Sequence, residues 1–368
     1  SRYVNGGMNN RAICSLPALA GAYGKKGSGC FGNISTGHLF KMDLVERPDF
    51  VESPTRVVNM NQLGAALNSL DDPPVKSLYV YHSNPASIAP DQNSVIRGLE
   101  REDLFTVVHE RFMTDTARYA DIVLPATSSL EYGDLYRAYG SYHLQRSRQV
   151  IEPIGESRSN FATFSALAGA LGWNEPLFRQ SEDDLIDQLL SESAVKDVVD
   201  LEALNRGEPV TLPAGRTGPP FATKSGKVEI ENFDLPEPLI RYLPASQGRY
   251  PLRLMTAPAL NILNSSFCER DDIRATEGGM KLQLNPEDAS ERNLREGEIV
   301  TASNDHGEVE FILTINGGVP AGVAVAEGAW WVEAAPGSRT VNALTSQVLT
   351  DMGRGCTMYD NFIEVKRP

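Results

Sequence analysis

Two short apolar runs flank a polar segment near the middle of the chain, and this arrangement constrains the fold most. Residues 104–108 and 122–124 are rich in branched and aromatic side chains, and the second run stops at Pro125. Both runs predict β-strands, because branched side chains suit a pleated surface and proline cannot donate to a strand ladder. Between them, Thr114-Asp-Thr116 offers hydroxyls and a carboxylate where a helix can begin. Open α/β sheets build nucleotide sites in this way at the carboxyl edge of their strands.

The residues just upstream predict the preceding strand and helix of the same sheet. Residues 77–81 have a strand pattern, and residues 91–102 have an apolar helical face. Followed by the first apolar run, they form a strand–helix–strand unit of about 30 residues, the size of a parallel crossover. We therefore expect the loop Ser83-Asn-Pro85 at the same sheet edge as His109 and Glu110. As an alternative, Asn-Pro is only a turn former.

Helical spacing of apolar residues predicts further helices before a proline-rich stretch. These helices are expected over residues 12–23, 59–70 and 159–171 and from Ser181 onward, where Asp184 completes an approximate capping box, and a short strand is expected over 227–230. The prolines of the stretch, at positions 236, 238, 244 and 251, indicate a linker. We place a domain boundary near residue 248 and predict that residues 1–248 form an α/β domain with an open parallel, nucleotide-binding (Rossmann-like) sheet.

Residues 249–368 change from α/β alternation to closely spaced strands. Strands are predicted over residues 252–256, 297–303, 308–315 and 323–326, the second and third pairing across a tight turn. One helix intervenes, with Asn285 as its cap and Pro286 at its first position. Many short strands with one helix predict a small β-barrel domain.

Composition limits the possible partners. The apolar fraction is 41% with no apolar run long enough to span a bilayer, and the net charge of −14 argues against a nucleic-acid or acidic-membrane surface. The four cysteines, at positions 14, 30, 268 and 356, include no Cys-x-x-Cys pair. The spacing thus favours ordinary buried thiols over disulfides, a zinc ribbon or a local iron–sulfur motif. The compartment is not determined, with the cytoplasm slightly favoured.

The central segment also resembles a known family signature. Thr114-Asp-Thr-Ala117 followed by Ala120-Asp-Ile-Val-Leu-Pro-Ala126 is similar to the signature of the molybdopterin oxidoreductases, the formate dehydrogenase, nitrate reductase and dimethyl sulfoxide reductase group. Near the C-terminus, Thr256-Ala-Pro258, Trp330-Trp331 and Asn342-Ala-Leu-Thr345 resemble the molybdopterin-dinucleotide-binding domain of that family, a double-psi β-barrel. The resemblance covers nearly all of the chain.

This resemblance implies the carboxy-terminal part of a molybdenum or tungsten oxidoreductase that carries two molybdopterin guanine dinucleotides. The chain then binds and positions the cofactor, and by itself is expected to be inactive. The metal-ligating residue and an iron–sulfur cluster are expected in an amino-terminal remainder of the same polypeptide, and an electron-transfer subunit is a possible partner. We assign no catalytic or metal-ligating residue in this chain. The alternative is a redox-inactive scaffold subunit that keeps the same fold.

The resemblance also selects residues expected to contact the cofactor. They come from a glycine turn, the sheet edge, the polar segment and the barrel: Gly6, Gly7, Asn9, Ser83, Asn84, Pro85, His109, Glu110, Phe112, Thr114, Thr116, Asp121, Thr256, Ala257, Asn264, Ser265, Trp330, Asn342, Tyr359 and Asn361. Without the family, the two glycines indicate only a turn. Downstream, the chain keeps the family's Glu131, Gly133 and Gln145 but replaces the middle of that stretch with an aromatic-rich run, so subfamily and substrate stay open.

Two of these residues carry specific expectations. Neutral side chains such as that of Asn342 suit the donor and acceptor edge of a pterin, and we expect Asn342 on a polar loop with little core around it. Glu110 is expected to recognise guanine, because one carboxylate can accept both N–H groups on the Watson–Crick edge of that base. The alternative for Glu110 is a solvated side chain paired with Arg111 or Arg118.

Overall fold

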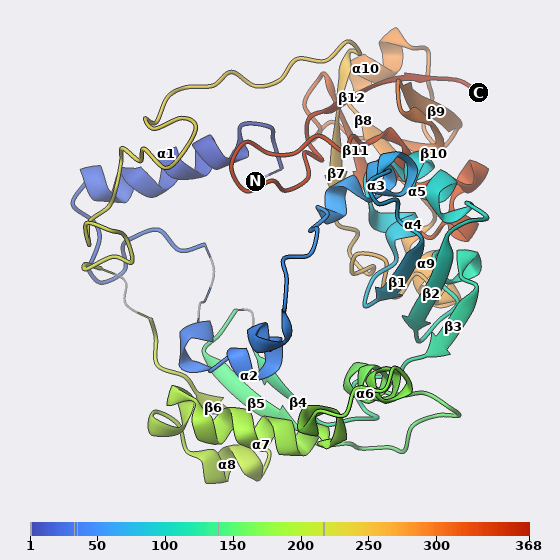
Figure 1. The fold of residues 1–368 in the computed structure, drawn as a ribbon. Coiled ribbons are helices and arrows are strands. Elements are labelled where there is room, and N and C mark those ends of the chain that lie inside the picture. The colour runs from blue at the N-terminus through green and yellow to red at the C-terminus, as the bar shows by residue number, and fades with distance from the viewer. Residues whose placement is uncertain (1, 33, 35, 139, 216–217) are drawn as a thin grey trace. The chain divides into compact units, whose positions relative to one another are not determined.

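A computed structural model describes residues 2–32, 34, 36–138, 140–215 and 218–368 (Figure 1). The chain forms two compact units. The first unit comprises residues 1–12, 57–123 and 230–368, and the second comprises residues 13–56 and 124–229. Each unit therefore combines segments that are far apart in the chain. The domain boundary near residue 248 stays a prediction.

The first unit contains the predicted parallel crossover. Strands β1 (Ser77–Tyr81), β2 (Phe105–Glu110) and β3 (Ile122–Pro125) form a sheet in the order β1-β2-β3. β1 and β2 are parallel with Tyr81 opposite His109, so the predicted strand–helix–strand unit is confirmed. The connection holds α4 (Pro85–Ile88) and α5 (Gln92–Leu99), and α5 packs on α3 (Leu63–Ser69) through buried leucines and valines. Glu110 is the last residue of β2 rather than the second residue after it.

The first unit also contains a closed six-stranded barrel. Its strands are β7 (Leu252–Ala257), β8 (Lys281–Leu284), β9 (Ile299–Asn304), β10 (Gly307–Ile315), β11 (Val323–Glu327) and β12 (Asn361–Lys366), closed in the order β10-β8-β11-β7-β12-β9. Fully buried side chains such as Leu254, Phe311 and Ile363 fill its interior. The predicted pairing of β9 with β10 and the helix α10 (Pro286–Glu291) behind its Asn285 cap are confirmed. β8, β12 and α9 (Asp271–Glu277) were not predicted.

Helix α1 (Gly6–Leu19) begins and ends earlier than the predicted residues 12–23. Its first turn is held from a distant part of the chain, because the Asp351 carboxylate accepts the Gly7 N–H at 2.6 Å and the Met8 N–H at 2.9 Å. A Cβ on Gly7 would lie only 2.6 Å from the Cβ of Met352. The glycine therefore permits close packing of two chain segments, and a carboxylate suits the positive end of a helix.

The second unit is built around a small antiparallel sheet that the sequence did not predict. Its strands are β4 (Asp134–Arg137), β5 (His143–Ser147) and β6 (Val210–Thr211). Helices α2 (Asp43–Glu46), α6 (Asn160–Ala170), α7 (Glu182–Glu192) and α8 (Leu201–Asn205) complete the unit. The Ser181–Asp184 capping box of α7 is confirmed. The strand expected over 227–230 is wrong, since these residues form no strand.

Short 3₁₀ helices connect these elements throughout the described chain. They are η1 (Gly37–Leu39), η2 (Pro48–Phe50), η3 (Met60–Gln62), η4 (Ala117–Tyr119), η5 (Pro176–Arg179), η6 (Ala194–Asp197), η7 (Val332–Ala334), η8 (Pro336–Ser338) and η9 (Val341–Leu344). Across the residues that the structure describes, no helix has the length and apolar character needed to cross a membrane.

Glu131 anchors a loop of the second unit. The buried carboxylate accepts the backbone N–H of Ser128 at 2.6 Å and of Ile154 at 2.7 Å, together with the Ser157 hydroxyl. The hydrogen bonds from Ser128, then that from Ile154, lower the pKa of Glu131 from 4.5 to about 2. A carboxyl whose pKa is lowered on folding stabilises the protein above its unfolded-state pKa, and this contribution is lost as the pH falls.

We therefore expect Glu131→Gln to lower stability at pH 7 and to flatten the loss of stability between pH 4.5 and about 2. Urea unfolding measured at several pH values tests this expectation. The exposed Glu152 provides a matched control, because Glu152→Gln should leave the pH profile unchanged. Parallel profiles for the wild type and Glu131→Gln would contradict the assignment.

Candidate functional site

The carboxyl edge of the β1–β2 sheet exposes several large side chains. Because Tyr81 is opposite His109, both strands end at the same edge. Tyr81, Phe112 and Met113 are 43–52% exposed there, and the Arg111 guanidinium lies 5.6 Å from the centroid of the Phe112 ring. Glu110 is partly exposed and accepts the Arg111 backbone N–H at 2.7 Å. This edge thus offers aromatic surface beside a carboxylate and a guanidinium.

Behind the exposed edge lies a buried hydrogen-bond network around Asn84. The Asn84 side-chain oxygen accepts the Thr116 N–H at 3.1 Å and the Thr116 hydroxyl at 2.7 Å, and its amide nitrogen donates to the Ser87 Oγ at 3.0 Å. Thr116 Oγ1 accepts the Ala86 N–H at 3.0 Å. Asn84, Ser87 and Thr116 are at most 3% exposed. Their hydrogen bonds fasten α4 to the polar segment after β2.

Asp115 connects this network to η7, the short helix that follows barrel strand β11. One oxygen of its carboxylate accepts both the Ser87 hydroxyl and the Val332 backbone N–H, the latter at 2.7 Å. Asp115 is 3% exposed. Next to it, Arg118 forms an ion pair with Glu333 rather than with Glu110. A buried carboxylate is costly unless it accepts hydrogen bonds. The bonds from Ser87 and Val332 therefore allow Asp115 to remain in the interior, where it joins α4 to η7.

A second set of buried amides joins the same helix to η9. Asn342 is 5% exposed and donates to the Ser87 carbonyl at 2.8 Å. Gln92 donates to the Ala86 carbonyl at 2.6 Å and accepts the Thr340 N–H at 2.9 Å. The expectation that Asn342 occupies a polar loop with little core around it is therefore wrong. Its amide supports α4, so its replacement would alter the fold locally.

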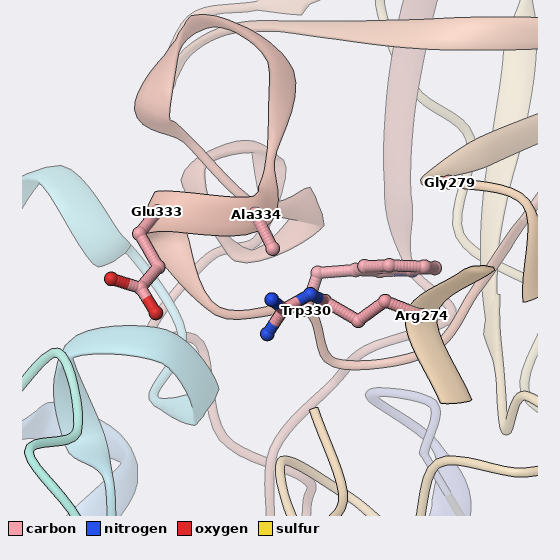
Figure 2. A pocket seen from close by; sticks show the side chains of 5 residues that line it. All are labelled: Arg274, Gly279, Trp330, Glu333 and Ala334. Carbon is pink, nitrogen blue, oxygen red and sulfur yellow. The ribbon is translucent and has the colours of Figure 1, made fainter. Parts of the chain in front are cut away.

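An open pocket of about 470 Å³ lies beside this network, lined by Arg274, Gly279, Trp330, Glu333 and Ala334. In Figure 2 the Arg274 side chain extends alongside the Trp330 indole, and its guanidinium end lies toward Glu333. Trp330 is 2% exposed, and its indole N–H donates to the Glu327 carbonyl at 3.0 Å. The guanidinium end of Arg274, which also donates to Asp271 and to the Cys268 carbonyl, gives this pocket a positive group that suits an anionic ligand.

Other predicted site residues lie away from this pocket or support the backbone. Asp121 accepts the Thr106 N–H at 2.6 Å, at the amino end of β2 and thus at the opposite edge from Glu110. Asn361 is 4% exposed and accepts the Ser346 N–H at 2.9 Å. The Asn9 side-chain amide donates a hydrogen bond to the Asn5 side-chain oxygen, and the Tyr359 ring packs edge-on against Tyr3. These contacts indicate structural roles.

The remaining predicted residues divide between strand ends and a turn. Thr256 and Ala257 end β7, and Ser265 offers its carbonyl to the Trp331 indole at 2.8 Å. Asn264 is exposed with a φ of +52°.

The sheet-edge residues differ in their exposure. Pro85 begins α4, and Ser83 before it is partly exposed. His109 is 1% exposed within β2, and Thr114 Oγ1 accepts the Ala117 N–H. Gly6 is the first residue of α1.

Sequence reasoning missed several residues that complete the site. Asp115, Ser87 and Gln92 form the buried network, while Arg274 and Glu333 line the pocket. Asp115 lies between two predicted threonines and carried a visible signal, since a carboxylate next to two apolar strands requires partners if it is buried. No sequence signal distinguished Arg274 or Glu333, because charged residues of these types are equally common on solvated helix surfaces. Among the described residues, no three His, Cys, Asp or Glu side chains are grouped to hold a metal ion.

Comparison with known families gives two matches that cover most of the chain. Residues 2–170 match the family described as molybdopterin oxidoreductase. Residues 252–361 match the molydopterin dinucleotide binding domain. The second match begins at β7 and ends at the first residue of β12, and thus comprises nearly all of the barrel.

Curated relatives agree with these matches. The chain is 36% identical to the probable oxidoreductase YoaE of Bacillus subtilis (strain 168) over 99% of this chain and 55% of the relative. It is 26% identical to the dimethyl sulfoxide reductase DmsA of Escherichia coli (strain K12) over all of this chain and 52% of that protein. The chain spans about half the length of these relatives.

Among solved structures, the acetylene hydratase from Pelobacter acetylenicus has the same fold. Its TM-score is 0.72 at 22% identity, covering 89% of this chain and 50% of that one. The two domain matches and the relatives make this chain similar to molybdopterin oxidoreductases over most of its length.

Proposed function

We propose that this chain holds a molybdopterin guanine dinucleotide cofactor in a molybdenum or tungsten oxidoreductase. The observation that carries the proposal is that the matched dinucleotide-binding domain forms a barrel with a pocket containing a guanidinium and an indole. That pocket adjoins the polar segment after β2 through the Arg118–Glu333 ion pair. The sheet edge and the barrel pocket together would suit a ligand that is too long for either of them alone.

The side chains present have donors and acceptors that fit such a ligand. The Arg274 guanidinium donates to Asp271 and to the Cys268 carbonyl, and the remaining N–H groups of this 26% exposed side chain can donate to a phosphate. The buried Trp330 indole forms part of the pocket wall, while Glu110 and Arg111 offer charged groups at the sheet edge. The cofactor would supply the redox chemistry when bound. The protein residues would bind it, orient it and exclude water.

Other parts of the proposal concern the longer protein. We propose that the barrel has double-psi topology, and that an amino-terminal remainder carries the metal ligand and an iron–sulfur cluster and meets an electron-transfer subunit. Ile13, Leu16 and Leu19 of α1 are 56–73% exposed along one helical face, which the remainder would cover. Slower hydrogen exchange of α1 in the longer protein than in this chain would support that contact.

The redox-inactive scaffold is the competing function. Metal and pterin analysis of the longer protein separates the two, because a scaffold would contain neither. Absence of pterin together with retained assembly on a partner subunit would contradict the enzymatic proposal.

For the sheet edge we propose that Glu110 recognises guanine. Its carboxylate would accept two adjacent N–H donors of guanine, and hydrogen bonds to charged groups contribute on the order of 1.5–3 kcal/mol each. Adenine lacks that donor pair. The chain should therefore bind guanosine diphosphate at least about tenfold more tightly than adenosine diphosphate.

Calorimetric titration with the two nucleotides, repeated on Glu110→Gln, tests this assignment. The preference should disappear in that variant. Glu102→Gln is the matched control, because it removes an exposed carboxylate near the amino end of β2, at the opposite edge. A guanine preference that survives Glu110→Gln, or equal affinities in the wild type, would exclude Glu110 as the recognition group.

A further inference from the structure

Cys14 and Cys30 form a close thiol pair within the second unit. Their Sγ atoms are 3.2 Å apart, and both residues are free cysteines. Cys14 lies on α1 and is exposed, while Cys30 lies on the glycine-rich loop that follows the helix and is partly exposed. The expectation of four ordinary buried thiols is therefore wrong for Cys14 and Cys30, and also for the partly exposed Cys356. Cys268, in contrast, is buried.

The loop that carries Cys30 is held against the helix by contacts that do not involve sulfur. The Tyr23 hydroxyl donates to the Cys14 carbonyl at 2.7 Å, and the Tyr23 ring packs edge-on against Phe221 at 5.1 Å. Cα of Gly218 lies 3.9 Å from the position of a Cβ on Gly24. The two thiols are therefore brought together by the packing of the loop, which raises their effective concentration toward each other.

We propose that Cys14 and Cys30 are a reversible redox site that closes to an intramolecular disulfide. A low-molecular-weight disulfide of the glutathione type is the oxidant. The Cys14 thiolate attacks one sulfur of that disulfide, forming a mixed disulfide and releasing one thiolate. The Cys30 thiolate then attacks the Cys14 sulfur, and the second small thiolate leaves. Two protein thiols lose two electrons and two protons, and one small disulfide becomes two thiols.

The geometry assigns different roles to the two cysteines. Cys14 is the more accessible and meets the external disulfide first, whereas Cys30 is positioned to resolve the intermediate. The hydrogen bond with Cys30, and next burial, raises the pKa of the Cys14 thiol. Because the thiolate is the nucleophile, the first step should accelerate as the pH rises above neutrality. This site is independent of the proposed cofactor function, since it requires only the chain itself.

Tryptic peptide mapping without reductant provides the test. Trypsin cleaves after Arg11, Lys25, Lys26 and Lys41, so Cys14 and Cys30 fall in separate peptides, 12–25 and 27–41. After incubation with oxidised glutathione, the wild-type chain should give these two peptides joined, with the loss of two hydrogens and no retained glutathione. Dithiothreitol should separate them again.

Single variants distinguish the roles. Cys30→Ser should retain glutathione on Cys14, because no resolving thiol is present, and Cys14→Ser should give no joined peptides. Cys356→Ser is the matched control, since it removes another partly exposed thiol and should leave the joined pair unchanged. Wild-type protein that keeps glutathione on both cysteines, or gives no joined 12–25 and 27–41 pair, would overturn the proposal. Joined peptides that involve Cys356 equally often would do the same, since they would indicate non-specific oxidation.

Discussion

Replacing Asp115 by alanine is expected to lower the free energy of unfolding by about 2–4 kcal/mol, because a buried hydroxyl and a partly buried backbone N–H lose a charged acceptor. Those donors are the Ser87 hydroxyl and the Val332 backbone N–H. The loss should be cooperative with Asn84, which donates to the same Ser87 oxygen. Urea unfolding of the purified chain, followed by intrinsic tryptophan fluorescence, measures the change.

Two further variants make the Asp115 result specific. Asp115→Asn keeps an acceptor but removes its charge, so its loss should be smaller than that of alanine. Asp103→Ala is the control from the turn before β2, because the Asp103 side chain is 51% exposed in its ion pairs with Lys76 and Arg101 and should contribute only about 0–1 kcal/mol. If Asp115→Ala and Asp103→Ala had equal effects, the contact between the polar segment and the barrel side would not depend on Asp115.

Replacing Arg146 by methionine should destabilise the second unit by about 2–3 kcal/mol. Arg146 is 3% exposed on β5, where its guanidinium donates to Asp183 at 2.6 Å, to Asn205 at 2.8 Å and to Asp187. Breaking a buried ion pair costs about 3–5 kcal/mol when the remaining charge stays buried. Here the two carboxylates are 51% and 62% exposed and can regain water, so the smaller range applies.

Arg148 provides the control for Arg146. It lies two residues further along the chain, contacts the same Asp183 at 3.2 Å, and is 52% exposed. Arg148→Met should therefore change stability by only about 0–1 kcal/mol. Thermal unfolding of both variants should show the difference. Equal shifts in the two variants would mean that the buried position of Arg146 contributes nothing beyond a surface ion pair.

The elements predicted best from sequence are those in which local pattern and tertiary environment agree. β1, the β9–β10 pairing and the Asn285 cap each follow from residues adjacent in the chain, namely branched runs, a tight turn and a capping side chain. The parallel crossover was predictable because the lengths of its strands and helix leave few ways to connect them. The family resemblance also predicted a β-barrel near the C-terminus, and residues 252–366 contain a closed six-stranded barrel that overlaps the second domain match.

The elements missed are those whose stability comes from partners far along the chain. β12 pairs with β7 and β9, and β4 pairs with β5 within an aromatic-rich stretch that has little strand alternation. α1 begins at Gly6 because Asp351 caps it, a contact that no local pattern signals. Backbone donors of a helix end need an acceptor, but the chain can supply it from any distance.

For the candidate site, the amino-acid sequence by itself identified two segments at the sheet edge, and the tertiary structure decided what each of their side chains does. The Thr114-Asp-Thr116 segment and the Ser83-Asn-Pro85 loop were both identified from their polar residues after a strand. Only the folded chain shows Asn84 and Thr116 bonded to each other in the interior, while Glu110 and Phe112 keep exposed surface. The physical reason is that a polar side chain after a strand can satisfy its hydrogen bonds either inward or toward a ligand. Burial, which depends on packing from distant segments, selects between the two.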